Sequence, residues 1–109
     1  MPNPSTDTAR EGGMAEVRVI GDIGYEVQLK DVLAALDAQG SVTALTVRIH
    51  STGGSVFDGT AIYNALMRHG ATRANGGSGL AVFIEGVALS SASFIAMAGD
   101  TISMPENGL

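Results

Sequence analysis

The sequence predicts an α/β fold in which most strands run parallel. Short runs of β-branched and alternating apolar residues recur along the chain, stretches with apolar residues at helical spacing separate them, and glycines stand at the junctions. Strands that are joined through crossover helices pair in parallel and form a buried sheet. We therefore expect the order β-α-β-α-β-α-β in a single domain without internal repeats.

The first half of the chain is expected to contribute two strands and one helix. Residues 16–20 alternate apolar and charged side chains, as a strand does. Apolar residues at helical spacing predict a helix over 25–39, and Gly40 is a favourable C-terminal stop. Residues 45–49 alternate and are rich in β-branched side chains, which predicts a second, central strand.

A second helix is expected over residues 56–68. Ser55 and Asp58 have the spacing of a capping box at its N-terminus. The stripe predicted to face the core consists of Phe57, Ala61, Ile62, Ala65 and Leu66.

The remaining segments predict a loop, a strand, a helix and a short strand. Residues 71–79 are glycine-rich and are expected to form a flexible loop. Residues 80–85 predict the third strand, 91–98 the third helix and 101–104 the fourth strand. Asp100 is expected to be a turn residue between the last two elements.

Composition narrows the class of protein. The chain has 109 residues, no cysteine and a formal net charge of −5 without a basic cluster, which argues against nucleic acid or an anionic membrane surface as a partner. No apolar run reaches the length of a membrane span or forms a secretory signal, so we expect a cytoplasmic protein. Residues 1–14 are expected to form a disordered arm, and 15–109 the domain.

A serine at a strand-to-helix junction is the first candidate site residue. Ser90 follows the apolar run and Gly86, and it directly precedes the third predicted helix. A serine at such a turn is a candidate nucleophile, because unpaired N–H groups at a helix N-terminus favour a developing anion. Serine is also a preferred N-cap, so this stretch alone leaves both roles open.

The glycine pair Gly53-Gly54 stands at another strand-to-helix junction. Paired glycines there permit positive φ and allow another backbone to approach closely. One interpretation is a backbone N–H that points at a substrate carbonyl oxygen, and the other is a plain tight turn. The chain lacks the Gly-Lys-Ser/Thr of a phosphate-binding loop.

The sequence offers neither a metal site nor a local base for Ser90. Without cysteine, and with only His50 and His69, it lacks metal-ligand spacing, so no metal or cofactor is expected. His69 is placed to act as a cation at a helix C-terminus, while His50 adjoins the glycine turn. The only lysine, Lys30, lies on the first predicted helix and does not suggest a Ser–Lys dyad.

Two segments together resemble ClpP-like serine peptidases. Residues 49–66 read Ile-His-Ser-Thr-Gly-Gly-Ser-Val-Phe-Asp-Gly-Thr-Ala-Ile-Tyr-Asn-Ala-Leu, similar to the strand, glycine turn and helix of that family. Residues 86–100 read Gly-Val-Ala-Leu-Ser-Ser-Ala-Ser-Phe-Ile-Ala-Met-Ala-Gly-Asp, similar to its nucleophile segment. The phage and prophage head-maturation branch is the most similar, and the resemblance covers residue 16 to the end.

The resemblance implies a serine endopeptidase with an acyl-enzyme mechanism. It implies Ser90 as nucleophile, the backbone N–H groups of Gly54 and Ser91 as oxyanion donors, and Ser55-Val56 as the segment that pairs with an extended polypeptide substrate. It implies a spiral of βαβ units that assembles into a homo-oligomeric ring. The phage branch suggests a capsid or scaffold protein as substrate, and the wider family an ATP-dependent unfoldase as partner.

The resemblance also implies that this chain is incomplete. In the family, the catalytic histidine, the triad aspartate and the ring-contact helix follow the position that corresponds to Leu109. We therefore expect a chain that is truncated before them and inactive by itself. The alternatives are a non-catalytic assembly subunit of the same fold and an acyl-CoA enzyme of the crotonase type.

Overall fold

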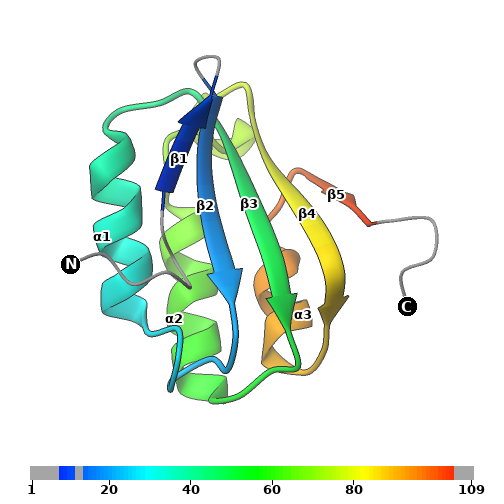
Figure 1. Cartoon of the computed structure of the whole chain (residues 1–109). Helices are drawn as coiled ribbons and strands as arrows, with labels where there is room; N and C mark the ends of the chain where they lie inside the picture. Colours follow the sequence, from blue (N-terminus) through cyan, green and yellow to red (C-terminus); the bar gives the residue numbers. More distant parts are fainter. Residues whose placement is uncertain (1–7, 12–13, 105–109) are drawn as a thin grey trace.

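The structure is a computed structural model that describes residues 8–11 and 14–104 (Figure 1). Its elements in chain order are β1 (Thr8–Glu11), β2 (Met14–Ile20), α1 (Leu29–Gln39), β3 (Ala44–Ser51), α2 (Val56–Met67), the 3₁₀ turn η2 (Arg73–Asn75), β4 (Gly79–Ala88), α3 (Ser91–Ala96) and β5 (Thr101–Ser103). The five strands form one sheet in the order β1-β2-β3-β4-β5. β2 to β5 run parallel, and β1 pairs antiparallel with β2, so the expected α/β class is confirmed.

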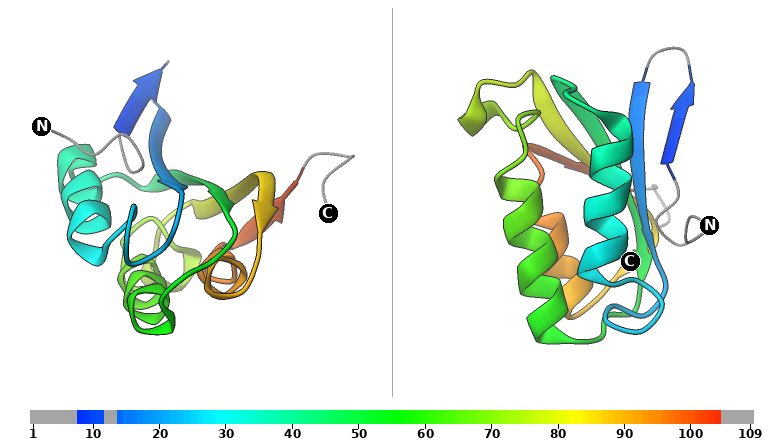
Figure 2. Two further views of the ribbon diagram at one scale, coloured as in Figure 1. Left: turned by 60° about the horizontal axis from the view of Figure 1, so that its bottom comes forward. Right: turned by 90° about the vertical axis from the view of Figure 1, so that its left-hand side faces the viewer.

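One face of the sheet forms the core. Val17, Val47 and Val82 lie on neighbouring strands and are almost fully buried. α1, α2 and α3 all pack on this side of the sheet, as Figure 2 shows. The alternation along each strand produces this face, because every second side chain points the same way.

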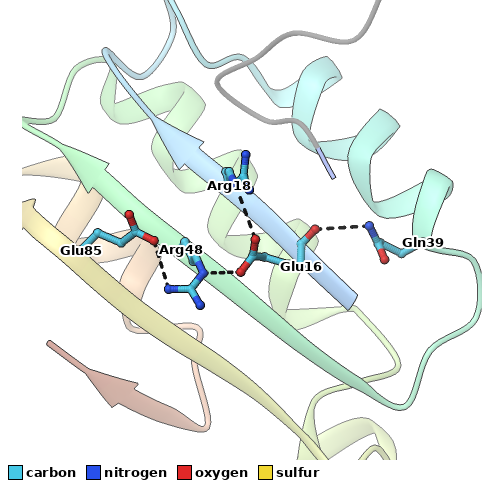
Figure 3. Close-up of polar contacts among 5 residues, drawn as sticks. All are labelled: Glu16, Arg18, Gln39, Arg48 and Glu85. Atoms are coloured by element: carbon cyan, nitrogen blue, oxygen red, sulfur yellow. Dashed lines mark hydrogen bonds and ion pairs between the residues drawn. The ribbon is translucent and has the colours of Figure 1, made fainter. Parts of the chain in front are cut away.

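The opposite face of the sheet carries charge and is not covered by any helix of the described chain (Figure 2). Arg48 on β3 reaches the carboxylates of Glu16 on β2 and of Glu85 on β4, the latter at 3.0 Å (Figure 3). The Arg48 guanidinium also lies 4.9 Å from the centre of the Phe83 ring. The expectation of a buried sheet thus holds for one face only, because charged residues alternate with the apolar ones.

α1 begins later than expected. The carbonyl of Asp22 accepts hydrogen bonds from the amides of Glu26 and Val27, at 2.8 and 2.9 Å, so the chain turns tightly before the helix. The helix begins at Leu29, where Gln28 and Asp31 form a capping box. Gly40 ends the helix at φ 71°, as predicted.

The structure adds detail at two other segments, and at one of them the expectation is wrong. Phe57 was predicted to face the core, but its side chain is 90% exposed, because the first turn of α2 projects past the edge of the sheet. The segment 71–79 is compact: Ala71 and Thr72 are buried, and the Asp100 carboxylate accepts from the amides of Leu80 and Arg73 at 2.8 and 3.1 Å.

The strand β1 lies within a segment for which the sequence predicted no element. Its backbone pairs with β2 from Thr8↔Val17 to Glu11↔Met14. The rest of the expected arm, residues 1–7 and 12–13, lies outside the described residues, as does 105–109. Within the described ranges, none of the helices has the length and apolar content of a membrane span.

Candidate active site

Three chain segments meet where β2, β3 and β4 end. The amide of Ile23, after β2, donates to the carbonyl of Gly53, and the amide of Ser55 donates back to the carbonyl of Ile23, at 2.9 and 2.8 Å. The amide of Leu89, after β4, donates to the carbonyl of Ser51 at 3.1 Å. Because parallel strands end at the same edge of a sheet, these three loops form one surface there.

Ser90 lies at the tip of a strained turn. Its dihedrals are φ 53° and ψ −126°, and among the described residues it is the only non-glycine residue with positive φ. The amide of Ala92 donates to the carbonyl of Leu89 at 3.0 Å, so residues 89–92 form a type II′ turn with Ser90 at its first central position. That position favours glycine, and strain of this kind is typical of functional sites.

The side chain of Ser90 does not cap α3. Ser90 holds the N-cap position of the helix, but its side chain makes no capping hydrogen bond. Its exposed hydroxyl has no hydrogen-bond partner among the described residues. The Ser93 hydroxyl instead donates to the Ser90 carbonyl at 2.7 Å. The sequence left two roles open for Ser90, a nucleophile or a helix N-cap, and its side chain does not act as the cap.

The glycine turn after β3 lies directly against Ser90. A Cβ at Gly53 would stand 2.8 Å from the Cβ of Ser90 and 3.4 Å from its hydroxyl oxygen. A Cβ at Gly54, where φ is 144°, would stand 2.2 Å from the carbonyl oxygen of Ile23. Both positions therefore require glycine because other parts of the chain approach too closely for a side chain.

The backbone groups of Gly54 are free on the side away from Ile23. The two hydrogen bonds of the parallel bridge between Ile23 and Gly54 use the Gly53 carbonyl and the Ser55 amide. In a parallel ladder, the residue between these two bonding neighbours, here Gly54, directs its own N–H and C=O away from the partner strand at Ile23. Within the described chain no hydrogen bond engages the Gly54 amide, so this short extended segment presents an open edge.

Ser91 contributes differently from Ser90. Its side chain is 7% exposed, and its hydroxyl has no hydrogen-bond partner in the described part of the molecule. Its amide stands in the first turn of α3 and is not engaged by any described acceptor. Ser91 can therefore offer its backbone N–H to a ligand, but its side chain is directed into the packing.

Both backbone groups of Ser55 are occupied. Its hydroxyl accepts from the Asp58 amide at 3.2 Å, as expected of an N-cap, and its carbonyl accepts from the Gly59 amide. Its own amide donates to Ile23, so the Ile23 carbonyl replaces the second half of the expected capping box. Val56, the next residue, is 67% exposed.

The two histidines have different surroundings. His50 lies over β4, where a Cβ at Gly86 would stand 2.5 Å from its Nδ1. The Nδ1 of His69 accepts from the Ala71 amide at 3.0 Å, and burial lowers the pKa of His69. Burial thus disfavours the cation that the sequence suggested at His69. Within the described residues, no cluster of His, Cys, Asp or Glu could hold a metal ion.

Sequence reasoning did not identify Ser51. Its side chain is 3% exposed, and its hydroxyl donates to the carbonyl of Gly21 at 2.6 Å and accepts from the amide of Gly53 at 3.1 Å. The signal in the sequence was a hydroxyl residue in phase with the apolar positions 45, 47 and 49 of the strand, two residues before a glycine pair. Ser51 joins the loop after β2 to the glycine turn.

The fold and this edge define an α/β domain with a serine at a strained strand-to-helix junction, beside a glycine turn with an unengaged amide. The Clp protease family model matches residues 16–107, and the chain belongs to this family. Among curated proteins, none matches the chain.

Proposed function

We propose that this chain carries the nucleophile and oxyanion half of a serine endopeptidase site. Ser90 acts as the nucleophile: its hydroxyl oxygen attacks a peptide carbonyl, the C–N bond breaks, and the amine leaves with the proton that the serine gives up. Water then hydrolyses the acyl-enzyme, which releases the carboxylic acid and restores the Ser90 hydroxyl. Membership of the Clp protease family supports peptidase chemistry at the level of the family. The specific role of Ser90 rests on its backbone conformation.

The strained turn at Ser90 is the observation that carries this proposal. A serine at φ 53° stands where glycine is favoured, at a cost of about 1–3 kcal/mol. Its hydroxyl neither caps α3 nor bonds to another described group. A serine that is costly to place and makes no structural bond is best explained by a reaction of its hydroxyl.

The amides of Gly54 and Ser91 are proposed as the oxyanion donors. Neither is engaged within the described chain, and their segments are in contact through Gly53 and Ser90. Preorganised N–H groups stabilise the negative charge that develops on the carbonyl oxygen of the tetrahedral intermediate.

The open edge at Gly54 and the following Ser55-Val56 are proposed to receive an extended polypeptide. Added strands bind through main-chain hydrogen bonds. Because both backbone groups of Ser55 are occupied, the Gly54 groups and the Val56 amide are the ones available for this pairing.

The chain by itself is proposed to turn over peptides slowly or not at all. No histidine, lysine or carboxylate within the described residues makes a hydrogen bond to the Ser90 hydroxyl. Without a general base, only the oxyanion donors and substrate binding accelerate the reaction. The same observation favours the second candidate function, a non-catalytic assembly subunit of the Clp protease fold.

Self-association and a role in phage head maturation complete the proposal. Large apolar side chains are exposed at the carboxyl edge of the sheet and on α3, and they suit burial between copies: Tyr25, Val56, Phe57, Leu89, Phe94 and Met97. Capsid or scaffold proteins as substrates, and an unfoldase as partner, rest on the sequence resemblance to the phage branch and the wider family.

A serine-directed fluorophosphonate probe tests the nucleophile. We expect slow, specific labelling of the folded chain at Ser90, located by mass spectrometry of the digested protein. Ser90→Ala should abolish the labelling. Ser103→Ala, which changes an exposed serine on β5 away from this edge, should leave it unchanged.

Labelling that persists in Ser90→Ala would overturn the assignment of the nucleophile. No labelling, with no retention on immobilised coenzyme A, would favour the assembly subunit. Retention on coenzyme A without labelling would favour an acyl-CoA enzyme and contradict the peptidase proposal.

A further inference from the structure

We infer that Ser51 is a positioning residue for the Ser90 site and acts through Gly53; this inference rests on the proposed role of Ser90. The inference goes beyond the nucleophile and the oxyanion donors, since Ser51 contacts neither a substrate nor the Ser90 side chain. It depends on where the Ser51 hydroxyl lies and on what it holds.

The Ser51 hydroxyl adds a side-chain link between two loops whose backbones already pair at Ile23 and Gly54. It donates to the Gly21 carbonyl at 2.6 Å and accepts from the Gly53 amide at 3.1 Å. A serine hydroxyl supplies one donor and an acceptor, which match these two backbone groups. The Ser51 hydroxyl and the Gly53 amide are buried, so removal of the hydroxyl leaves this amide without its partner away from water, while the Gly21 carbonyl is only partly buried.

Ser51 also lies where the sheet changes register. Ile49 pairs with Ile84, but Ser51 pairs with Ala88, so β4 contains a local irregularity opposite His50. The Ser51 carbonyl then accepts from the amide of Leu89, the first residue of the strained turn. Ser51 thus contacts, through its backbone, the segment that leads into Ser90.

Gly53 connects Ser51 to Ser90. The Gly53 amide is held by the Ser51 hydroxyl, and the Cα of Gly53 packs against the Ser90 side chain and the Leu89 carbonyl. A rotation of the glycine turn would therefore move the wall beside the Ser90 hydroxyl. It would also turn the Gly54 amide, the proposed oxyanion donor, because that amide follows Gly53 directly.

Ser51→Ala tests the inference, with Thr72→Val as the matched control. Thr72 is equally buried and its hydroxyl donates to the His69 carbonyl at 3.0 Å. It follows Ala71, whose carbonyl accepts from the Gly79 amide at the start of β4, the end of the strand away from Ser90. Each variant removes one buried hydroxyl. Thermal unfolding of the full 109-residue chain measures the stability lost in each.

Two readouts separate positioning from stability. By NMR, Ser51→Ala should shift the Cα and Cβ resonances of Ser90 and speed exchange of the Gly53 amide at least about tenfold more than that of the Val47 amide in the core. With the fluorophosphonate probe, the maximal labelling rate should fall at least about tenfold, while the half-saturating probe concentration changes less than about threefold, because misplaced groups slow the reaction more than binding. Thr72→Val should show neither change.

Unmoved Ser90 resonances in Ser51→Ala, or a labelling rate that falls no further than in Thr72→Val, would overturn the inference. If the unaltered chain is not labelled at all, the proposed nucleophile fails instead. The NMR measurement still decides whether Ser51 controls the conformation of Ser90.

Discussion

Gly59 of α2 lies against Ser91 of α3, so closely that a Cβ at Gly59 would stand 2.8 Å from the Cβ of Ser91. One turn further along each helix, the rings of Tyr63 and Phe94 are 4.5 Å apart. The close approach of the two helices therefore begins beside the strained turn at Ser90. The small residue at position 59 helps to set where α3, and hence Ser90, begins.

Gly59→Ala should destabilise the protein, although alanine is the better helix former. The added methyl group meets Ser91 at less than contact distance, and overpacking of this kind costs about 1–3 kcal/mol. Chemical denaturation measures the change in the free energy of unfolding. Gly70→Ala, at a site with no neighbour within 4 Å of a new Cβ, is the control. Equal stability of the two variants would contradict the packing argument.

Ser91→Ala should leave stability unchanged or raise it, by up to about 1 kcal/mol. The Ser91 hydroxyl is buried and lacks a hydrogen-bond partner in the described structure, and such a group costs free energy of this order. The backbone N–H of Ser91 is retained, so labelling of Ser90 should persist. A loss of labelling without a loss of stability would show that the register of the proposed nucleophile is wrong by one residue.

Ser90→Gly should stabilise the fold while it removes the reactive group. Glycine adopts φ 53° without a steric penalty, which relieves about 1–3 kcal/mol of strain, and its greater freedom in the unfolded chain offsets about 0.5–1 kcal/mol of that gain. Differential scanning calorimetry of the two proteins measures the shift in Tm. A lower Tm for Ser90→Gly would mean that the hydroxyl stabilises the fold and that the strain argument is wrong.

Acidification should destabilise the protein in two separate ranges of pH. Burial lowers the pKa of His69 from its ordinary 6.5, so the unfolded chain binds that proton first and stability declines below about pH 6.5. Hydrogen bonds from the Leu80 and Arg73 amides lower the pKa of Asp100 from its ordinary 3.8, so its contribution is complete above that pH and is lost as the pH falls through the lower value of the folded state.

Variants assign each range of pH to its group. His69→Gln should flatten the decline in Tm between about pH 7 and pH 5, and Asp100→Ala should flatten it below about pH 4. Asp37→Ala, at an exposed position on α1, is the control. A decline that is unchanged in Asp100→Ala would assign the acid sensitivity to other carboxylates.

Phe57→Ser should weaken self-association without affecting folding. The ring is 90% exposed, so it contributes little to the core, while its burial between two copies would favour association. Light scattering at micromolar concentration, together with Tm, separates the two effects. If the unaltered chain is a monodisperse monomer, or if Phe57→Ser associates as strongly, this residue does not lie at an interface.

The sequence predicted the class of fold and most elements because the apolar pattern is regular. Val17, Val47 and Val82 belong to strands in which core-facing apolar residues recur at every second position, and this period of two marked the strands. The sequence also led us to expect a buried sheet, which is correct for one face only. Phe57 was misplaced because helical spacing says which side chains share a face but not where a helix projects past its sheet. The strand at Thr8–Glu11 was missed because its pairing is made by the backbone, and its residues are largely polar.

Only part of the candidate site could be predicted from the sequence. Ser90 and Gly54 stood at recognisable junctions, whereas their geometry depends on contacts that no local pattern encodes. The clash that makes glycine necessary at position 54 is with Ile23, and the burial that lowers the pKa of His69 comes from the surrounding structure. Ser51 was missed for the same reason, since its two hydroxyl partners lie on different loops.

The contacts that shape the strained turn at Ser90 and the glycine turn beside it join residues far apart in the chain. Gly54 meets Ile23, and Gly53 meets Ser90, across about 30 or more positions of sequence. Closing loops of this length costs conformational entropy, which the pairing of the intervening strands offsets. The turn is thus a reporter of the folded state as a whole: in a denaturant titration, reaction at Ser90 should disappear together with the helical circular dichroism signal, and a synthetic peptide of residues 79–104 should not react at all.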